Sequence, residues 1–131
     1  MEDMFARIVL GHLAGDYLLQ SRQMALAKSA PGIKGWLWCL AHCLIYTASL
    51  CLFLWTYRPL IVILVFFSHF PIDRWSLASK WLNIIRGRDF IAAYTEKKQH
   101  WEIDVAFFCL VYAVADNTLH LILLWFILKL V

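Results

Sequence analysis

The stretch Trp36–Tyr57, WLWCLAHCLIYTASLCLFLWTY, is followed, after a turn at Arg58-Pro59, by Leu60–Trp81, LIVILVFFSHFPIDRWSLASKW. Each run is close to the roughly 20 apolar residues that a helix needs to cross a hydrocarbon core of about 30 Å. The runs are continuous and leucine-rich instead of alternating, which argues against the strands of a membrane barrel. They therefore predict two membrane helices that form a tight antiparallel pair.

Two further apolar runs, at about 4–20 and 103–128, flank this pair, for which the helix bounds are about 36–57 and 60–81. Of the 131 residues, 63% are hydrophobic and only 16% are charged, whereas soluble domains average roughly 45–50% and 25%. We predict an all-α polytopic membrane protein, a four-transmembrane-helix bundle that forms a single domain over residues 1–131. This composition excludes a nucleic-acid-binding domain, a disordered chain and a secreted disulfide framework.

The basic residues are distributed unevenly between the ends of these runs. Nine of the twelve lie on or near one side, and only Arg7, Arg58 and Lys129 lie on the other. Because cytoplasmic loops are enriched in Lys and Arg, loops 21–35 and 82–102 are predicted to be cytoplasmic and both termini to lie outside. The second of these loops mixes apolar and basic residues. It fits an amphipathic helix lying on the inner leaflet and equally well a solvated loop.

Ionisable residues interrupt the apolar runs. An Asp at mid-membrane costs about 2.5–3.5 kcal/mol, so Asp16, Asp73 and Asp116 need compensating partners. Four of the five histidines have an Asp four residues away, which places the two side chains on one helix face. The pairs within the runs are His12 with Asp16, His69 with Asp73, and His120 with Asp116; His100 and Asp104 repeat the spacing outside them.

Imidazole and carboxylate together are the ligands that Zn, Mn and Fe favour. We predict one or two divalent ions, with Zn first and Mn or Fe as alternatives, held by the six residues His12, Asp16, His69, Asp73, Asp116 and His120. The predicted catalytic residues are Asp16, Asp73 and His42, the last as a further ligand or proton shuttle. Residues predicted to position substrate or support the ligands are Gln20, Tyr46, Lys28 and Arg74. A single His–Asp pair is also explained by an interhelical hydrogen bond.

Two backbone features lie beside these residues. Pro71 cannot donate a backbone hydrogen bond, so it predicts a kink between His69 and Asp73. Gly11 and Gly15 have the Gly-x-x-x-Gly spacing that allows helices to approach closely. We interpret this motif as packing inside the bundle, with dimerisation as the alternative.

The spaced polar positions resemble those of a family of small prokaryotic integral membrane proteins, domain of unknown function 3307, over nearly the whole chain. The residues that carry the resemblance are His12-Leu-Ala-Gly-Asp16-Tyr-Leu-Leu-Gln20, Met24-Ala25, Lys28, His42, Tyr46, Ser68-His69, Asp73, Asp116-Asn117 and His120. In that pattern Gln usually stands where this chain has Asn117. The resemblance implies a four-helix protein of the prokaryotic inner membrane and no established activity. The plan is more distantly similar to inner-membrane metal-dependent hydrolases.

Our first functional hypothesis is an intramembrane metal-dependent hydrolase that uses metal-activated water. The basic residues Arg22, Lys28, Arg74 and Lys80 near the cytoplasmic mouth suggest a lipid-linked substrate, such as a phospholipid or an isoprenoid phosphate. The alternative is a transporter module, presumed homo-oligomeric, in which the same His and Asp residues relay protons or metal ions. A purely structural subunit is a third hypothesis, but it leaves the buried carboxylates unexplained.

Overall fold

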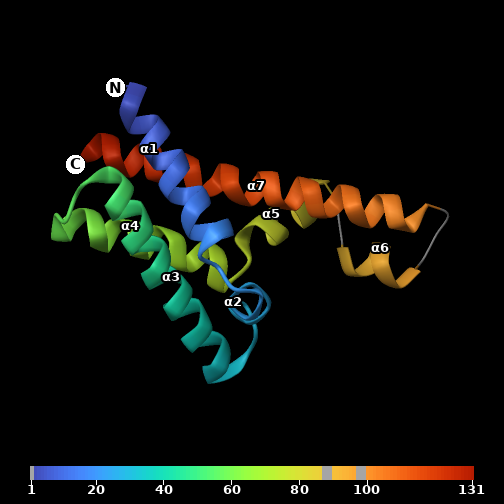
Figure 1. Ribbon diagram of the computed structural model, residues 1–131. Helices are drawn as coiled ribbons and strands as arrows, with labels where there is room; N and C mark the ends of the chain where they lie inside the picture. The colour runs from blue at the N-terminus through green and yellow to red at the C-terminus, as the bar shows by residue number, and fades with distance from the viewer. Residues whose placement is uncertain (1, 87–89, 97–99) are drawn as a thin grey trace.

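The computed structural model describes residues 2–86, 90–96 and 100–131, and every regular element within these ranges is a helix. Figure 1 shows the long C-terminal helix α7 lying across the others, with the two chain termini at the same end of the molecule. The elements in chain order are α1 (Glu2–Leu13), η1 (Ala14–Leu18), α2 (Arg22–Ala27), α3 (Gly32–Leu54), α4 (Pro59–Arg74), α5 (Leu77–Arg86), α6 (Phe90–Glu96) and α7 (Trp101–Leu130). The all-helical class predicted from the sequence is confirmed.

The first apolar run forms two different kinds of helix. The α-helix α1 continues directly into η1, a single π-helical segment in which the Leu19 amide donates to the Ala14 carbonyl at 3.0 Å. Such wide turns usually occur at functional sites. The helix ends at Leu18, and the Ser21 hydroxyl then caps α2 by accepting from the Met24 amide at 3.2 Å.

The second apolar run forms α3, the first part of the third forms α4, and these two helices pack against each other. Helix α3 ends where Trp55 takes up a left-handed backbone conformation, with φ 52°. Helix α4 begins at Pro59, whose fixed φ suits the first turn of a helix. The connection between the helices is short because these two local signals stop one helix and start the next within a few residues.

The third run is not one helix over 60–81 as expected. Helix α4 ends at Arg74, and α5 follows at a bend of 56°. Ser76 has φ 48°, a left-handed conformation that interrupts a right-handed helix. The sequence predicted a kink at Pro71, whereas the bend lies a few residues later, between α4 and α5. The Trp75 amide donates to the Pro71 carbonyl at 3.2 Å.

Helices α3 and α7 are long and apolar enough to cross a membrane, and α4 with α5 forms a third span if the bent pair is taken as one. The segment formed by α1 and η1 is shorter than these. Two or three candidate spans are thus supported by length and composition, where the sequence predicted four.

The connection predicted between residues 82 and 102 contains helix in its described part. Helix α5 extends to Arg86, and α6 covers Phe90–Glu96 and packs against α7. Arg88, Lys97 and Lys98, which contribute to its basic character, lie outside the described residues. Of the two interpretations, the described part favours helix over an extended solvated loop.

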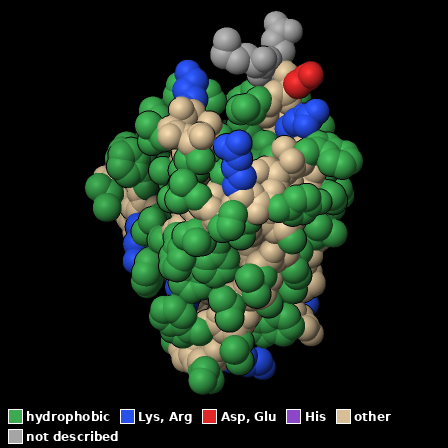
Figure 2. All heavy atoms as spheres, turned by 90° about the vertical axis from the view of Figure 1, so that its left-hand side faces the viewer, with side chains coloured by type: hydrophobic (Ala, Val, Ile, Leu, Met, Phe, Trp, Pro, Cys, Tyr) green, Lys and Arg blue, Asp and Glu red, His purple; other side chains and the backbone are tan. Residues whose placement is uncertain are grey.

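Apolar side chains make up both the core and much of the surface. The core cluster joins residues of α1, α3, α4 and α7, namely Ile8, Tyr46, Leu50, Ile61, Val65 and Leu124. Figure 2 shows hydrophobic side chains covering most of one face, with only scattered charged groups. Large apolar side chains such as Leu18 and Phe67 are also exposed. A surface of this kind fits association with a membrane.

The two glycines of the Gly-x-x-x-Gly motif lie against α3, which confirms that the motif packs inside the molecule. A Cβ on Gly11 would lie 2.9 Å from Leu50 Cδ1, and one on Gly15 would lie 2.7 Å from Tyr46 Cδ2. The Ser49 hydroxyl also donates to the Gly11 carbonyl at 3.2 Å. These contacts place His12 and Asp16 directly beside α3.

We expect Gly15→Ala to destabilise the protein by about 1–3 kcal/mol, because the new methyl group overlaps the buried Tyr46 ring. Thermal unfolding in detergent micelles measures the effect as a lower midpoint temperature. Ala106→Val, on an exposed position of α7, is the control and should leave the midpoint unchanged. A Gly15→Ala protein that unfolds at the wild-type temperature would show that η1 and α3 are not in close contact.

Candidate metal centre

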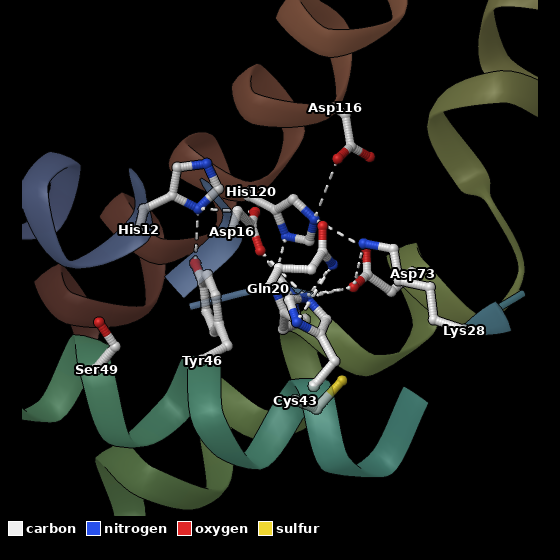
Figure 3. A network of polar contacts seen from close by, with 12 residues as sticks. His12, Asp16, Gln20, Lys28, Cys43, Tyr46, Ser49, Asp73, Asp116 and His120 are labelled. Carbon is white, nitrogen blue, oxygen red and sulfur yellow. Dashed lines mark hydrogen bonds and ion pairs between the residues drawn. The ribbon is translucent and has the colours of Figure 1, made fainter. Parts of the chain in front are cut away.

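The polar residues of the apolar helices converge in the interior of the molecule. Figure 3 shows side chains from α1, η1, α3, α4 and α7 pointing toward one another. The four histidines among them are buried, and so is Asp73. The residues brought together are His12, Asp16, Gln20, Lys28, His42, Tyr46, His69, Asp73, Asp116 and His120.

Four ligand-type atoms meet at the centre of this cluster. His42 Nε2 lies 2.9 Å from Asp73 Oδ2, 3.0 Å from His69 Nε2 and 3.2 Å from Asp16 Oδ1. His69 Nε2 lies 3.1 Å from Asp73 Oδ2 and 3.6 Å from Asp16 Oδ1. We call these four residues the central tetrad.

The spacing within the central tetrad matches the donors of a tetrahedral ion. With metal–ligand bonds of about 2.0–2.1 Å, tetrahedral ligand atoms lie about 3.3 Å from one another. Five of the six separations within the tetrad run from 2.9 to 3.6 Å. Asp16 Oδ1 is moreover buried without a hydrogen-bond partner in the described structure, although His42 Nε2 is 3.2 Å away. Such a surplus of buried lone pairs is what a bound cation compensates.

A second group of ligand-type atoms adjoins the tetrad through Asp73. The other oxygen of Asp73, Oδ1, lies 3.6 Å from His120 Nε2. His120 Nε2 in turn lies 3.9 Å from Asp116 Oδ2. His120 Nε2 is buried and has no hydrogen-bond partner in the described structure. Asp73, Asp116 and His120 form one of three groups whose ligand atoms all lie within 4.8 Å of one another; the others are Asp16, His69, His120 and His42, His69, Asp73.

His12 has a different environment from the other buried histidines. Its Nε2 lies 2.7 Å from Asn117 Oδ1, and its Nδ1 lies 2.9 Å from the Tyr46 hydroxyl. The amide oxygen can only accept, so Nε2–H donates and Nδ1 accepts from Tyr46. Both ring nitrogens are therefore occupied, and His12 belongs to none of the three groups among the described residues. His42, predicted as an additional ligand or shuttle, takes the central position instead.

The sequence analysis gave Asn117 no role. Asn117 accepts from His12 and donates to the Ala113 carbonyl at 2.6 Å, so it links α1 to α7. The signal that could have identified it is its spacing: it lies three residues before His120, on nearly the same helix face.

Tyr46 of α3 contacts two of the histidines in the cluster. Its ring stacks on His69 with centroids 3.6 Å apart and an interplanar angle of 15°. Its hydroxyl reaches His12, as described above. One fully buried side chain thus holds the orientation of two imidazoles.

Lys28 and Gln20 belong to the segment before α3 and lie at the edge of the cluster. Lys28 Nζ donates to Asp73 Oδ2 at 2.8 Å, and the Gln20 amide oxygen accepts from Nζ at 3.0 Å. Burial alone would lower the pKa of the Lys28 ammonium, but the Asp73 carboxylate outweighs this effect and raises it. Lys28 is therefore a fixed positive charge at the edge of the site.

Three predicted or flagged residues lie elsewhere. The Arg74 guanidinium lies over the Trp36 ring, 4.9 Å from its centroid, and forms no ion pair within the described part of the chain. His100 precedes α7 and is exposed, as is Asp104. Because His100 is twenty residues before His120, about 30 Å of helix separates them.

The fold and the site define an all-helical protein with an apolar exterior and a buried cluster of histidines and aspartates. The chain belongs to the family described as Protein of unknown function (DUF3307), whose model matches residues 4–131. No curated protein and no solved structure matches it.

Proposed function

We propose that this protein is an intramembrane metal-dependent hydrolase whose central tetrad holds a divalent ion, Zn by preference and Mn or Fe as alternatives. The observation that carries the proposal is a buried site in which each of two imidazole nitrogens lies 2.9–3.6 Å from the other and from two carboxylate oxygens. A second ion would be held by Asp73, Asp116 and His120, whose ligand atoms lie within 4.8 Å of one another.

In this proposal the chain forms a four-span bundle in the prokaryotic inner membrane, with both termini outside. The short first span consists of α1 and η1, and the bent pair α4–α5 forms the third. The excess of basic residues at the loops between the spans supports the orientation. In Figure 1 both termini lie at the same end of the molecule, which is compatible with this orientation.

A bound metal would supply Lewis acidity and lower the pKa of water at the site. With one ion in the central tetrad, Asp116 is the carboxylate best placed to accept a proton, because its side chain is 16% exposed and its nearest ion-pair partner, His120, is 3.9 Å away. His12 and Tyr46 position the ligands and do not bind metal. Hydrolysis would form a bond from the water oxygen to phosphorus, break the phosphorus–oxygen ester bond, and transfer a proton from water to the leaving oxygen.

Lys28 supports an anionic substrate. Its ammonium group contacts Asp73 and is 13% exposed, so it borders both the ligands and the outside. The Lys28 ammonium could donate to a phosphate group at the site as well as to Asp73, and such a charge-assisted hydrogen bond would favour an anionic substrate. We propose membrane phospholipids or isoprenoid phosphates as the substrate class, with the apolar tail in the surrounding lipid.

Metal content tests the proposal. Protein purified in mild detergent without a polyhistidine tag should contain one or two equivalents of Zn, Mn or Fe by inductively coupled plasma mass spectrometry. His69→Gln should remove the metal, because His69 belongs to the central tetrad. His12→Gln should retain it with an affinity lowered by about 10–100-fold, the usual effect of a residue that only orients a ligand.

His100→Gln, on an exposed histidine, is the control and should bind metal like the wild type. A wild-type protein without metal would refute the hydrolase. Metal lost equally in the His12 and His69 variants would refute the assignment of ligands. Release of phosphate from phosphatidic acid or an isoprenyl phosphate then tests the substrate class.

One observation favours the second candidate function, a proton relay in a transporter module. His42, His69 and His120 form a continuous row, with Nε2–Nε2 and Nδ1–Nδ1 separations of 3.0 Å each. A row of imidazoles can pass a proton from ring to ring. Proton flux into liposomes that persists after metal removal would favour this function over hydrolysis.

A further inference from the structure

A second feature lies on the opposite side of the α3–α4 pair from the candidate metal centre. It is an apolar groove of about 600 Å³, and the residues that define its walls include Leu44, Ala48, Tyr57, Ile63 and Phe67. At 100° per residue, a position two residues along a helix points roughly 200° away. Leu44, Ala48 and Phe67 each lie two residues from His42, Tyr46 and His69 respectively. The groove is therefore separate from the metal centre.

The two helix faces that form the groove continue beyond it as an apolar stripe toward Arg74. On α3, Trp36, Leu40, Leu44 and Ala48 follow one another at intervals of four residues. On α4, Ile63, Phe67, Phe70 and Arg74 follow at intervals of three or four. Residues at these intervals share one helix face. The Trp36 and Phe70 rings lie 5.6 Å apart, so the two rows also meet across the helix pair.

Arg74 lies at the end of this stripe and has no anionic partner in the described part of the chain. The residue is only 9% exposed, and its Nε has no hydrogen-bond partner in the described structure. Among the described residues its charged group contacts the Trp36 ring, with the guanidinium carbon 4.9 Å from the ring centroid, and forms no ion pair. A buried charge without a paired anion is costly. Arg binds phosphate well because its planar fork donates two parallel hydrogen bonds.

We propose that this face binds one anionic phospholipid as a structural lipid, with its phosphate on Arg74 and an acyl chain in the α3–α4 groove. From Arg74 to Ile63 is eleven residues, or about 16 Å of helix, which is close to the thickness of one leaflet of a 30 Å core. The charge selects an anionic headgroup, and the groove accepts the chain. The proposal depends on the membrane placement described above and not on the metal chemistry.

Native mass spectrometry of the detergent-purified protein tests the site with two probes of equal chain length, phosphatidylglycerol and phosphatidylcholine. The wild type should retain phosphatidylglycerol with at least about a tenfold preference, as expected for a charge-assisted bond. Arg74→Gln should bring phosphatidylglycerol binding down to the level of phosphatidylcholine. Arg58→Gln, exposed at the far end of α4, is the matched control and should keep the preference.

Ala48→Phe fills the groove from an exposed position and should weaken the binding of both lipids. This variant keeps the site testable if Arg74→Gln does not fold. Equal retention of the two lipids by the wild type, an Arg74→Gln protein that keeps the preference, or an Ala48→Phe protein with unchanged binding would each overturn the proposal. His69→Gln separates the two sites, because it should lose metal and still prefer phosphatidylglycerol.

Discussion

Asp73→Asn is expected to abolish metal binding and, with it, any hydrolytic activity. One Asp73 oxygen lies within 2.8–3.1 Å of Lys28, His42 and His69, and the other lies 3.6 Å from His120. The substitution keeps the shape of the side chain but removes the charge that both groups of ligands share. Even a residue that only orients a ligand changes metal affinity by about 10–100-fold, so we expect a loss of more than about 100-fold here.

Competition with a chelator of known affinity measures this loss, and thermal unfolding shows whether the variant is folded. Asp104→Asn is a close control, because Asp104 also lies four residues from a histidine but is exposed at the start of α7. It should bind metal like the wild type. A folded Asp73→Asn protein with unchanged metal affinity would mean that the convergence of side chains on Asp73 is a hydrogen-bond network and not a metal site.

Tyr46→Ala is expected to lower the free energy of unfolding by about 3–5 kcal/mol, the range for removing a fully buried aromatic ring. Three contacts are lost together: the stack on His69, the hydrogen bond to His12, and the packing against Gly15. Tyr46→Phe removes only the hydroxyl and should cost about 0.5–1.5 kcal/mol. Equilibrium unfolding in mixed micelles measures both values.

The control for this series is Tyr57→Ala, because Tyr57 is 77% exposed and lies at the end of the α3–α4 connection. Its effect should remain within about 0.5 kcal/mol. If Tyr46→Ala costs no more than Tyr57→Ala, the interior of the bundle is not packed around Tyr46. A large cost for Tyr46→Phe would instead assign most of the stability to the hydrogen bond with His12.

The helical class and the membership of the polar cluster were predictable because both depend on local spacing. His69 and Asp73 lie four residues apart in a helix, so their shared face follows from helix geometry alone. The same argument predicted that Asp16 and His12 lie together, and they do, at 3.5 Å. What it could not supply is the direction in which that face points once the helices pack.

The role of His12 shows this limit. Its partners Tyr46 and Asn117 come from α3 and α7, so only the packed structure shows that both of its nitrogens are occupied. Arg74 is a similar case, since its place over Trp36 depends on how α3 and α4 cross. The break after Arg74 was missed for a different reason. Ser76 adopts a left-handed backbone conformation, which is expected of glycine and cannot be predicted from a serine.

The central tetrad lies entirely before α5, while Asp116, His120 and Asn117, the partner of His12, belong to the last helix. During synthesis the four residues of the tetrad are therefore all present before α7 has been made. Lys28 also precedes Asp73 in the chain, so a countercharge is already available when that carboxylate enters the apolar interior. The order of the residues therefore makes the tetrad available first, and Asp116 and His120 join it only when α7 has been made.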